Sequence, residues 1–320
     1  MSTIKDVALR ANVSVTTVSR VINNNGYVHK DTKETITKAI EDLNYFPNNQ
    51  NNEFDDHSKK TIGIIINTIP STTASKLVDS IQQQCKENGY KTLLGITRNS
   101  QSLEKFYLDL FIKYDVDGII LTEEINSIVD FISLKKPMVS IDFKINDNIP
   151  SIKINNSLAV TNAAQELIDN NCKNVLLVKY TNDDINKYKT FVQTIKLNNI
   201  KLTSLNVDTN INKLSLYDFL KNSNFDGIYT TSDLIAIPVT TILQQLKINI
   251  PKECCMIGYD NSPFSTLIFP ALTSIDYPVE KIGESAVNTL DSIINHEDIN
   301  DKIITTELIK RESTKREILL

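Results

Sequence analysis

Residues 3–23, TIKDVALRANVSVTTVSRVIN, limit what this 320-residue chain can fold into more than any other stretch. Thr3 and Asp6 have the spacing of a capping box, and Ser14 is a favourable cap for a second helix. Apolar side chains recur with helical spacing in each half of the segment, at Ile4, Val7, Ala8 and Ala11 and then at Val18, Val21 and Ile22. The segment therefore predicts two short amphipathic helices joined by a turn.

The second of these helices leaves short side chains and one arginine outside its buried face. Val15, Thr16, Ser19 and Arg20 fall on its outer faces or at its N-terminal end. Such a surface suits the major groove of DNA, where an arginine can bind a guanine through two nitrogens. Helix pairs joined by a turn also occur in bundles that touch no nucleic acid, so the helical pattern alone leaves both interpretations open.

The same residues resemble the headpiece of the LacI/GalR family of bacterial transcription regulators. The family pattern T-I-x-D-V-A, then V-S-x-x-T-V-S-R-V-x-N, is met at Thr3-Ile4, Asp6-Val7-Ala8, Val13-Ser14, Thr17-Val18-Ser19-Arg20-Val21 and Asn23. The resemblance runs to about Pro47 and is traceable to Glu312-Ser313-Thr314. It implies a homodimer that binds a palindromic operator in double-stranded DNA. The DNA contacts that it implies are Thr3, Ser14, Val15, Thr16, Thr17, Ser19, Arg20 and Asn23.

A third helix is predicted after the NNGYV turn at residues 24–28. Asp31 and Glu34 again have capping-box spacing, and Pro47 is expected to stop the helix. The apolar stripe that closes a three-helix core is Ile36, Ala39, Ile40 and Leu43. Residues 1–47 are therefore expected to form a DNA-binding headpiece.

Residues 48–60, NNQNNEFDDHSKK, have almost no side chain to bury and predict a hinge linker. In the resembling family a short helix folds here on DNA and inserts a leucine into the minor groove. Phe54 stands at that position and is apolar enough to wedge a base step apart. A lone exposed phenylalanine in a simple tether is the alternative interpretation. Glu53, Asp55 and Asp56 depart from the family pattern and would repel nearby phosphates, so we expect a weak, salt-sensitive hinge contact.

Residues 61–320 alternate short apolar runs with amphipathic helical segments, which is typical of parallel strands in βαβ units. The predicted strands are 61–66, 92–96, 118–121 and 138–141, then 174–178, 227–230 and 255–259. The predicted helices are 75–88, 102–114, 156–170, 186–197 and 233–247. Residues 272–276 and 278–294 are expected to return to the first half. The fold class is α/β, with two lobes of doubly wound parallel sheet similar to periplasmic sugar-binding proteins.

In such folds a ligand lies outside the carboxyl ends of the strands, which makes Asp260 the best candidate contact. Gly258-Tyr259-Asp260 matches the G-[YF]-D of the resembling family, whose carboxylate binds sugar hydroxyls. Asp260 could instead cap the turn at residues 262–267. Ser232 and Asp233 stand where the family has Asn-Asp at the head of a helix, and Asp233 could equally be a structural cap.

Two further ligand positions depart from the family pattern. Lys187 replaces the ligand-clamping arginine, and a lysine lacks the planar fork of a guanidinium. Thr73 stands in a region where many members have aromatic side chains that stack on a sugar ring. A narrower pocket, a charged or phosphorylated ligand and a pocket without a ligand all stay open.

Composition excludes several other classes of protein. The four cysteines and three histidines lack metal-site spacing, and neither a nucleotide-binding motif nor a catalytic constellation is evident, so no cofactor is expected. No apolar run is long enough to cross a bilayer, which predicts a cytoplasmic protein. The net charge is −5, so DNA binding depends on where the headpiece cations lie. We expect a repressor modulated by a sugar or sugar derivative between the lobes, or alternatively a regulator that answers to a protein partner or to no effector.

Overall fold

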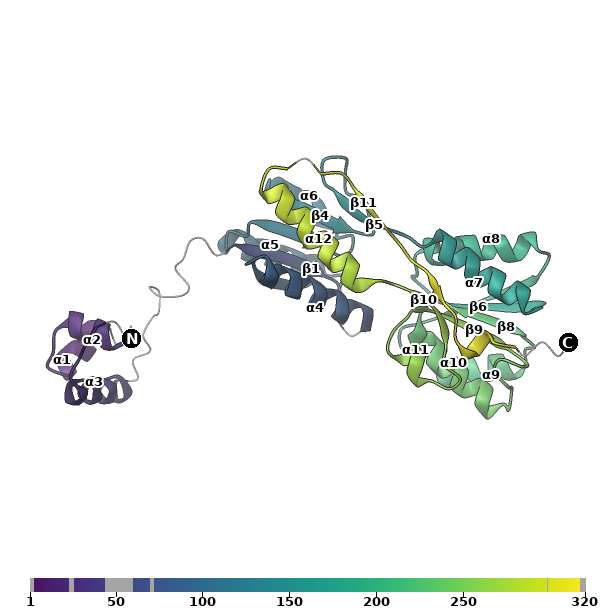
Figure 1. The fold of residues 1–320 in the computed structure, drawn as a ribbon, viewed down its shortest axis with the longest axis horizontal. Coiled ribbons are helices and arrows are strands. Elements are labelled where there is room, and N and C mark those ends of the chain that lie inside the picture. The colour runs from purple at the N-terminus through teal and green to yellow at the C-terminus, as the bar shows by residue number, and fades with distance from the viewer. Residues whose placement is uncertain (1–2, 23–25, 44–59, 70–71, 298, 317–320) are drawn as a thin grey trace. The chain divides into compact units, whose positions relative to one another are not determined.

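The computed structural model describes residues 3–22, 26–43, 60–69, 72–297 and 299–316. The chain divides into two compact units, Met1–Lys60 and Thr61–Leu320 (Figure 1). The predictions for Asn23, Phe54 and nearly all of the linker at 48–60 lie outside the described residues.

The described residues of the first unit form three helices, as the sequence predicts: α1 (Ile4–Arg10), α2 (Val15–Ile22) and α3 (Lys30–Asp42). Their common core consists of Val7, Ala8, Ala11, Val18, Ile36 and Ala39. The predicted capping box at the start of α1 is confirmed, because Thr3 N donates to Asp6 Oδ2 at 2.7 Å and Asp6 N donates to Thr3 Oγ1 at 3.4 Å.

The predicted cap of the third helix, Asp31, is wrong by two residues. Helix α3 begins at Lys30, and Lys33 N donates to His29 O, so Asp31 lies in the first turn. A carboxylate there is still favourable, because it faces the positive end of the helix dipole. At the other end of α3, Asp42 accepts a 3.1 Å hydrogen bond from Arg10 of α1, which ties the two helices together.

The second unit contains two six-stranded sheets, each the centre of one lobe (Figure 1). The first sheet has the order β11-β5-β4-β3-β1-β2, and all of its neighbouring strands are parallel. Its strands are β1 (Thr61–Ile66), β2 (Lys91–Ile96), β3 (Gly118–Leu121), β4 (Met138–Ile141), β5 (Ser151–Asn155) and β11 (Lys302–Thr305). The first lobe is completed by α4 (Thr72–Glu87) and α12 (Val279–Ile294), which bury one side of this sheet, and α5 (Gln101–Lys113) and α6 (Ile128–Ser133), which bury the other.

The second sheet has the order β12-β10-β9-β8-β6-β7, with β12 antiparallel and the other pairs parallel. Its strands are β6 (Asn174–Tyr180), β7 (Lys201–Val207), β8 (Gly227–Thr230), β9 (Cys255–Asp260), β10 (Thr273–Asp276) and β12 (Leu308–Ile309). The helices of this lobe are α7 (Ser157–Asp169), α8 (Lys189–Leu197), α9 (Lys213–Lys221), α10 (Asp233–Gln245) and α11 (Phe264–Leu267), with 3-10 turns η1 (Ile185–Lys187) and η2 (Glu312–Thr314).

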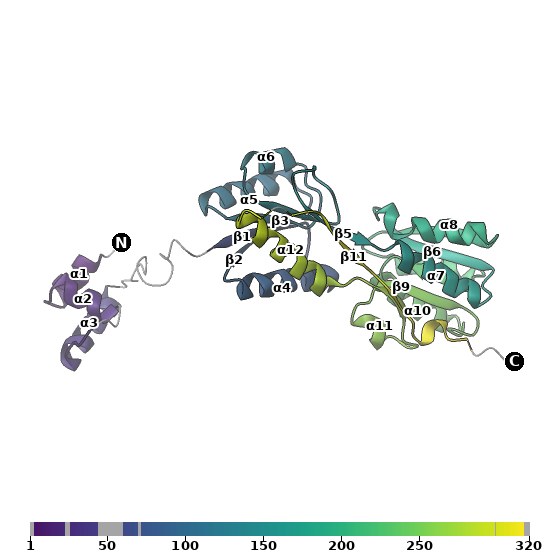
Figure 2. The ribbon, with the colours of Figure 1, turned by 45° about the horizontal axis from the view of Figure 1, so that its top comes forward.

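The chain passes between the lobes three times, after β5, after β10 and after β11. Figure 2 shows the consequence in colour, since the yellow-green α12 lies among the blue elements of the first lobe. The prediction that 278–294 returns to the first half is confirmed. The prediction for 272–276 is wrong, because β10 pairs with β9 and belongs to the second sheet. Asn156 and Tyr277 lie at two of these passages.

Candidate functional site

The N-terminal end of α2 is fixed by Ser14. Thr17 N donates to Ser14 Oγ at 3.1 Å, and the hydroxyls of Ser14 and Thr17 lie 2.8 Å apart. Asn12 adopts a positive φ of 52°, a left-handed conformation that asparagine tolerates, and this turns the chain from α1 into α2. The turn and the cap together set the direction of α2 against α1.

The outer surface of α2 carries the residues that the sequence assigns to DNA. Val15, Thr16 and Arg20 are exposed, whereas Val18 is fully buried in the headpiece core. Of the two arginines in the headpiece, Arg10 is engaged by Asp42, while Arg20 projects from the last turn of α2. The helix therefore has a fixed inner face and an exposed face on which short side chains surround a single guanidinium.

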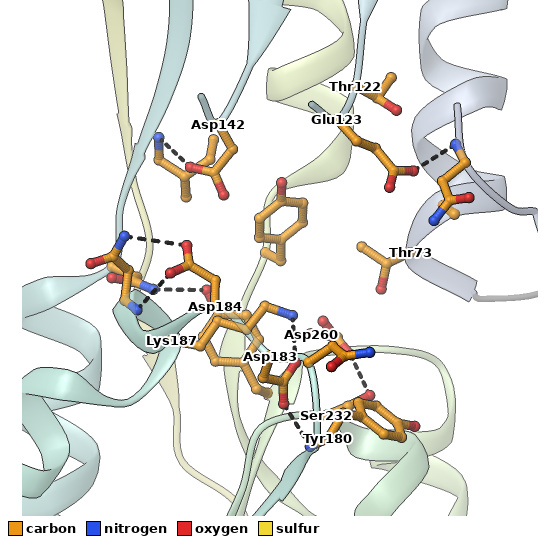
Figure 3. Close-up of a pocket in the computed structure, with 18 of the residues that line it drawn as sticks. Thr73, Thr122, Glu123, Asp142, Tyr180, Asp183, Asp184, Lys187, Ser232 and Asp260 are labelled. Carbon is orange, nitrogen blue, oxygen red and sulfur yellow. Dashed lines mark hydrogen bonds and ion pairs between the residues drawn. The ribbon is translucent and has the colours of Figure 1, made fainter. Parts of the chain in front are cut away.

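A cavity of about 1270 Å³ lies between the two lobes, at the carboxyl ends of their strands (Figure 3). Of the residues that the sequence assigns to a ligand, the structure brings four to the cavity wall: Thr73, Lys187, Ser232 and Asp260. Thr73 comes from the first lobe and the other three from the second. Asn156 and Tyr277, at the passages between the lobes, also line the cavity.

Asp260 ends β9 at the cavity, with a φ of 105° that few residues adopt. Ser232, the N-cap of α10, donates a 2.8 Å hydrogen bond to Asp260 Oδ2. Burial raises the pKa of Asp260 to about 7, while Lys187 opposes this shift. A carboxyl group held in this way can accept hydrogen bonds from ligand hydroxyls when ionised and donate one when protonated.

The structure does not bring Asp233 to the cavity wall. Its side chain is 1% exposed, and its Oδ2 accepts hydrogen bonds from Ser262 N at 2.7 Å and Ser262 Oγ at 2.9 Å. Its Oδ1 accepts a third from Ser274 Oγ at 2.7 Å. Burial raises the pKa of this carboxyl, and these hydrogen bonds oppose the shift. Asp233 thus joins α10 to the loop that follows Asp260 and to β10, and supports the cavity wall from behind.

Lys187 is held in place through its backbone and its ammonium group. Its carbonyl accepts a 2.9 Å hydrogen bond from the buried hydroxyl of Tyr229. Its Nζ lies 3.7 Å from Asp183 Oδ1 and 5.6 Å from the centroid of the Tyr259 ring. Tyr259 in turn accepts a hydrogen bond from Asn156 Nδ2 at 3.2 Å. Lys187 is therefore in contact, through the ring of Tyr259, with Asn156 at a passage of the chain between the lobes.

Four further carboxyl groups of the described residues line the cavity and are absent from the sequence-based assignments. Glu123 follows β3, Asp142 follows β4, and Asp183 and Asp184 follow β6. Glu123 accepts a 2.7 Å hydrogen bond from Asn67 N, and Asp183 accepts one of 2.8 Å from Tyr180 N (Figure 3). The strand-end rule that selects Asp260 applies equally to these positions, so a signal for them was present in the sequence.

Neither a membrane segment nor a metal cluster is found in the described part of the chain. None of its helices combines the length and the apolar character needed to cross a bilayer. No three histidine, cysteine or acidic side chains among these residues are grouped in a way that would hold a metal ion.

The raised pKa of Asp260 predicts how stability depends on pH. A folded-state value of about 7 against the usual 3.8 means that folding favours the protonated acid, so stability falls as pH rises from the lower value to the higher. Asp260→Asn removes the charge and should therefore raise the melting temperature of the full chain by more at about pH 8 than at about pH 5. The corresponding gain in the free energy of unfolding is at most about 4 kcal/mol. Equal changes at both pH values would contradict this account.

Comparison with known proteins agrees with both parts of the structure. Residues 3–48 match the family model described as "Bacterial regulatory proteins, lacI family". Residues 164–314 match the model described as "Periplasmic binding protein-like domain". The sucrose operon repressor of Streptococcus mutans is 30% identical over 315 residues, which cover 96% of this chain and 98% of that protein.

Two solved structures are similar in fold. A periplasmic binding protein/LacI transcriptional regulator from Alkaliphilus metalliredigens, complexed with D-xylulofuranose, has a TM-score of 0.71 at 26% identity and covers 81% of this chain and 100% of its own. The Lac repressor dimer bound to operator and the anti-inducer ONPF has a TM-score of 0.71 at 19% identity, with 98% and 99% covered. From its headpiece to its second lobe, the chain belongs to the lacI family of bacterial regulatory proteins.

Proposed function

We propose that this protein represses transcription as a homodimer that binds a palindromic operator, and that a small hydroxyl-rich molecule in the cavity between the lobes changes its affinity for that operator. As a lacI-family member, the chain is a DNA-binding transcription regulator modulated by a small-molecule effector. The sucrose repressor and the D-xylulofuranose complex support a sugar or sugar derivative as the class of effector.

The observation that carries the DNA-binding part is the two-sided character of α2. Val18 anchors the inner face in the headpiece core, and Val15, Thr16 and Arg20 occupy the exposed face. An anchored helix with short outer side chains can lie close to base edges in the major groove. Thr3, Ser14, Thr17, Ser19 and Asn23 are proposed to contact the backbone or bases around it. Phe54 is proposed to reach the minor groove.

The cavity supports a ligand-controlled regulator over one that answers to no effector. About 1270 Å³ is enough for a small molecule, and the wall combines carboxyl, hydroxyl, amide and ammonium groups from both lobes. A ligand that binds one arrangement of the lobes better than another can transmit about 1–3 kcal/mol to a distant site. That is enough to change operator occupancy several-fold.

The remaining assignments follow from this function. The chain is proposed to act in the cytoplasm, where operator DNA is accessible, and to have no enzymatic activity of its own. The lacI family consists of transcription regulators, and a sugar-modifying enzyme would have no use for the helix-turn-helix at residues 3–23.

Thermal melting of the full chain with sugars, sugar phosphates and nucleobases tests the ligand-binding part. A compound that binds only the folded protein raises the midpoint in proportion to the logarithm of its concentration. We expect at least one hydroxyl-rich compound to do so, and Lys187→Ala should remove the shift because its ammonium organises the wall of the second lobe. A shift that survives in both Lys187→Ala and Asp260→Asn would place the ligand elsewhere.

A further inference from the structure

The cavity between the lobes is lined by more acidic than basic side chains. Among the described residues its carboxyl groups are Glu123, Asp142, Asp183, Asp184 and Asp260, and they outnumber the three cations, Arg98, Lys187 and Lys189. A phosphorylated ligand would add to this excess negative charge, and the juxtaposition of like charges is costly in a partly desolvated site. The charge balance therefore favours a neutral or positively charged ligand.

The three cations leave part of this acidity uncompensated. Lys187 is engaged by Asp183 and the ring of Tyr259. Arg98 and Lys189 are exposed, as are Asp142 and Asp184, and neither cation makes an ion pair with any of the described residues. Asp142 makes no ion pair with any of the described residues. It accepts a 3.4 Å hydrogen bond from Ile154 N, which leaves most of its acceptor capacity unused.

The uncompensated charge is concentrated where the two lobes face each other. Figure 3 shows Asp142 of the first lobe opposite Asp184 of the second. Desolvation, opposed by the Ile154 N–H and reinforced by the charge of Asp184, raises the pKa of Asp142 to about 6, while Lys187 lowers it. Tyr277 lines the same cavity, and after burial the charge of Asp142 contributes to the raised pKa of its hydroxyl. Two carboxylates and an aromatic ring form a favourable environment for an ammonium group.

We propose that the effector is a hydroxyl-rich compound that carries an ammonium group, and that Asp142 and Asp184 hold this group between the lobes. The proposal rests on the proposed function, since it names the ligand class of the same cavity. Repulsion between the two carboxylates opposes any closer approach of the lobes. An ammonium group between them removes this repulsion, so the ligand binds the closed arrangement better and shifts the population toward it.

Matched sets of sugars test this proposal on the full chain. Thermal melting is measured at low ionic strength and near-neutral pH with glucosamine, galactosamine and mannosamine, with their neutral and N-acetylated counterparts, and with the corresponding 6-phosphates. We expect at least one amino sugar to raise the midpoint by several degrees, its neutral and acetylated counterparts to raise it less, and added salt to reduce the difference.

Two variants of the first lobe test whether Asp142 causes the preference for the amino sugar. Asp142 has a φ of 65°, which asparagine adopts readily, so Asp142→Asn should fold and should lose the preference for the amine. Asp147→Asn is the matched control, since Asp147 is exposed and outside the cavity wall, and it should keep the preference.

Each other outcome overturns the proposal. A neutral sugar that shifts the midpoint as much as its amine counterpart would identify a neutral-sugar site and leave the proposed function intact. A larger shift with a sugar phosphate would show that the acidic wall does not decide the ligand. No shift with any amino sugar would also reject an ammonium-bearing effector, whereas operator binding by the same preparation separately tests the proposed function.

Discussion

Arg20→Ala is expected to weaken binding to the operator by about 1–3 kcal/mol, or roughly 5- to 160-fold, and to relax the preference at one base pair in each half-site. The reason is that Arg20 projects from the exposed face of α2, whereas Arg10 is engaged by Asp42. A guanidinium can donate two parallel hydrogen bonds to a guanine, and their loss affects only the cognate base. Fluorescence anisotropy on the operator and on single-base variants measures both effects.

A phosphate contact is the competing role for Arg20, and two comparisons separate it from base reading. Arg20→Lys keeps the positive charge but loses the planar fork, so it should recover little of the lost preference if the arginine reads a base. Equal weakening on operator and scrambled DNA, with nearly full recovery by lysine, would mean that Arg20 holds the DNA backbone.

Gly258→Ala is expected to destabilise the second lobe by about 2–4 kcal/mol, a large share of the stability of a typical domain. A Cβ at this position would overlap Asp233 Oδ1 and lie 2.6 Å from Leu272 Cδ2. The methyl group would displace the carboxylate that accepts the hydrogen bond from Ser274. The loss should appear as a lower melting midpoint of the full chain.

Gly227→Ala is the matched control for this effect, because Gly227 lies in β8, the strand next to β9. A Cβ added to Gly227 would lie 3.1 Å from the nearest atom, Cys172 Sγ, and a small shift of the cysteine side chain can relieve this contact. The melting midpoint of the Gly258→Ala variant should therefore lie well below that of the Gly227→Ala variant. Similar midpoints for the two variants would show that the carboxylate of Asp233 yields easily and that its hydrogen bonds contribute little to the lobe.

The headpiece could be predicted closely from the sequence because its signals are local. Helical spacing selected the residues of its core, and the capping box at Thr3 depends on a side chain three positions away. The start of α3 was misplaced because Asp31 is favourable both as a cap and in the first turn of a helix. Spacing alone does not distinguish these two positions.

β1, β3, β8 and β9 were also predictable, since both of their faces are buried and they appear as continuous apolar runs. β7 and β11, which lie at the edges of their sheets, lack this signal. β7, KLTSLNV, is exposed or half-buried along its whole length, and β11 is largely exposed. The assignment of β10 to the wrong lobe had another cause, because pairing partners depend on contacts between distant parts of the chain.

The cavity was only partly predictable. Asp260 ends β9, Ser232 follows β8, and the two side chains are hydrogen-bonded at the cavity wall. The residue after Ser232, Asp233, instead lies in a buried hydrogen-bond network. Successive residues at the start of a helix project in different directions, so sequence adjacency does not tell which one faces a ligand. The opposition of Asp142 and Asp184 depends on how the lobes face each other, which no local pattern records.

Selection of operators from random double-stranded DNA by the full chain tests the central claim most directly. A dimer that reads DNA through α2 presents two copies of the same helix, so the enriched sequences should share a two-fold symmetric site with half-sites about one helical turn apart. The Arg20→Ala variant, selected in parallel, should lose the preference at one position of each half-site. Enrichment of no sequence, or of sites without two-fold symmetry, would contradict a homodimeric regulator that reads a palindromic operator.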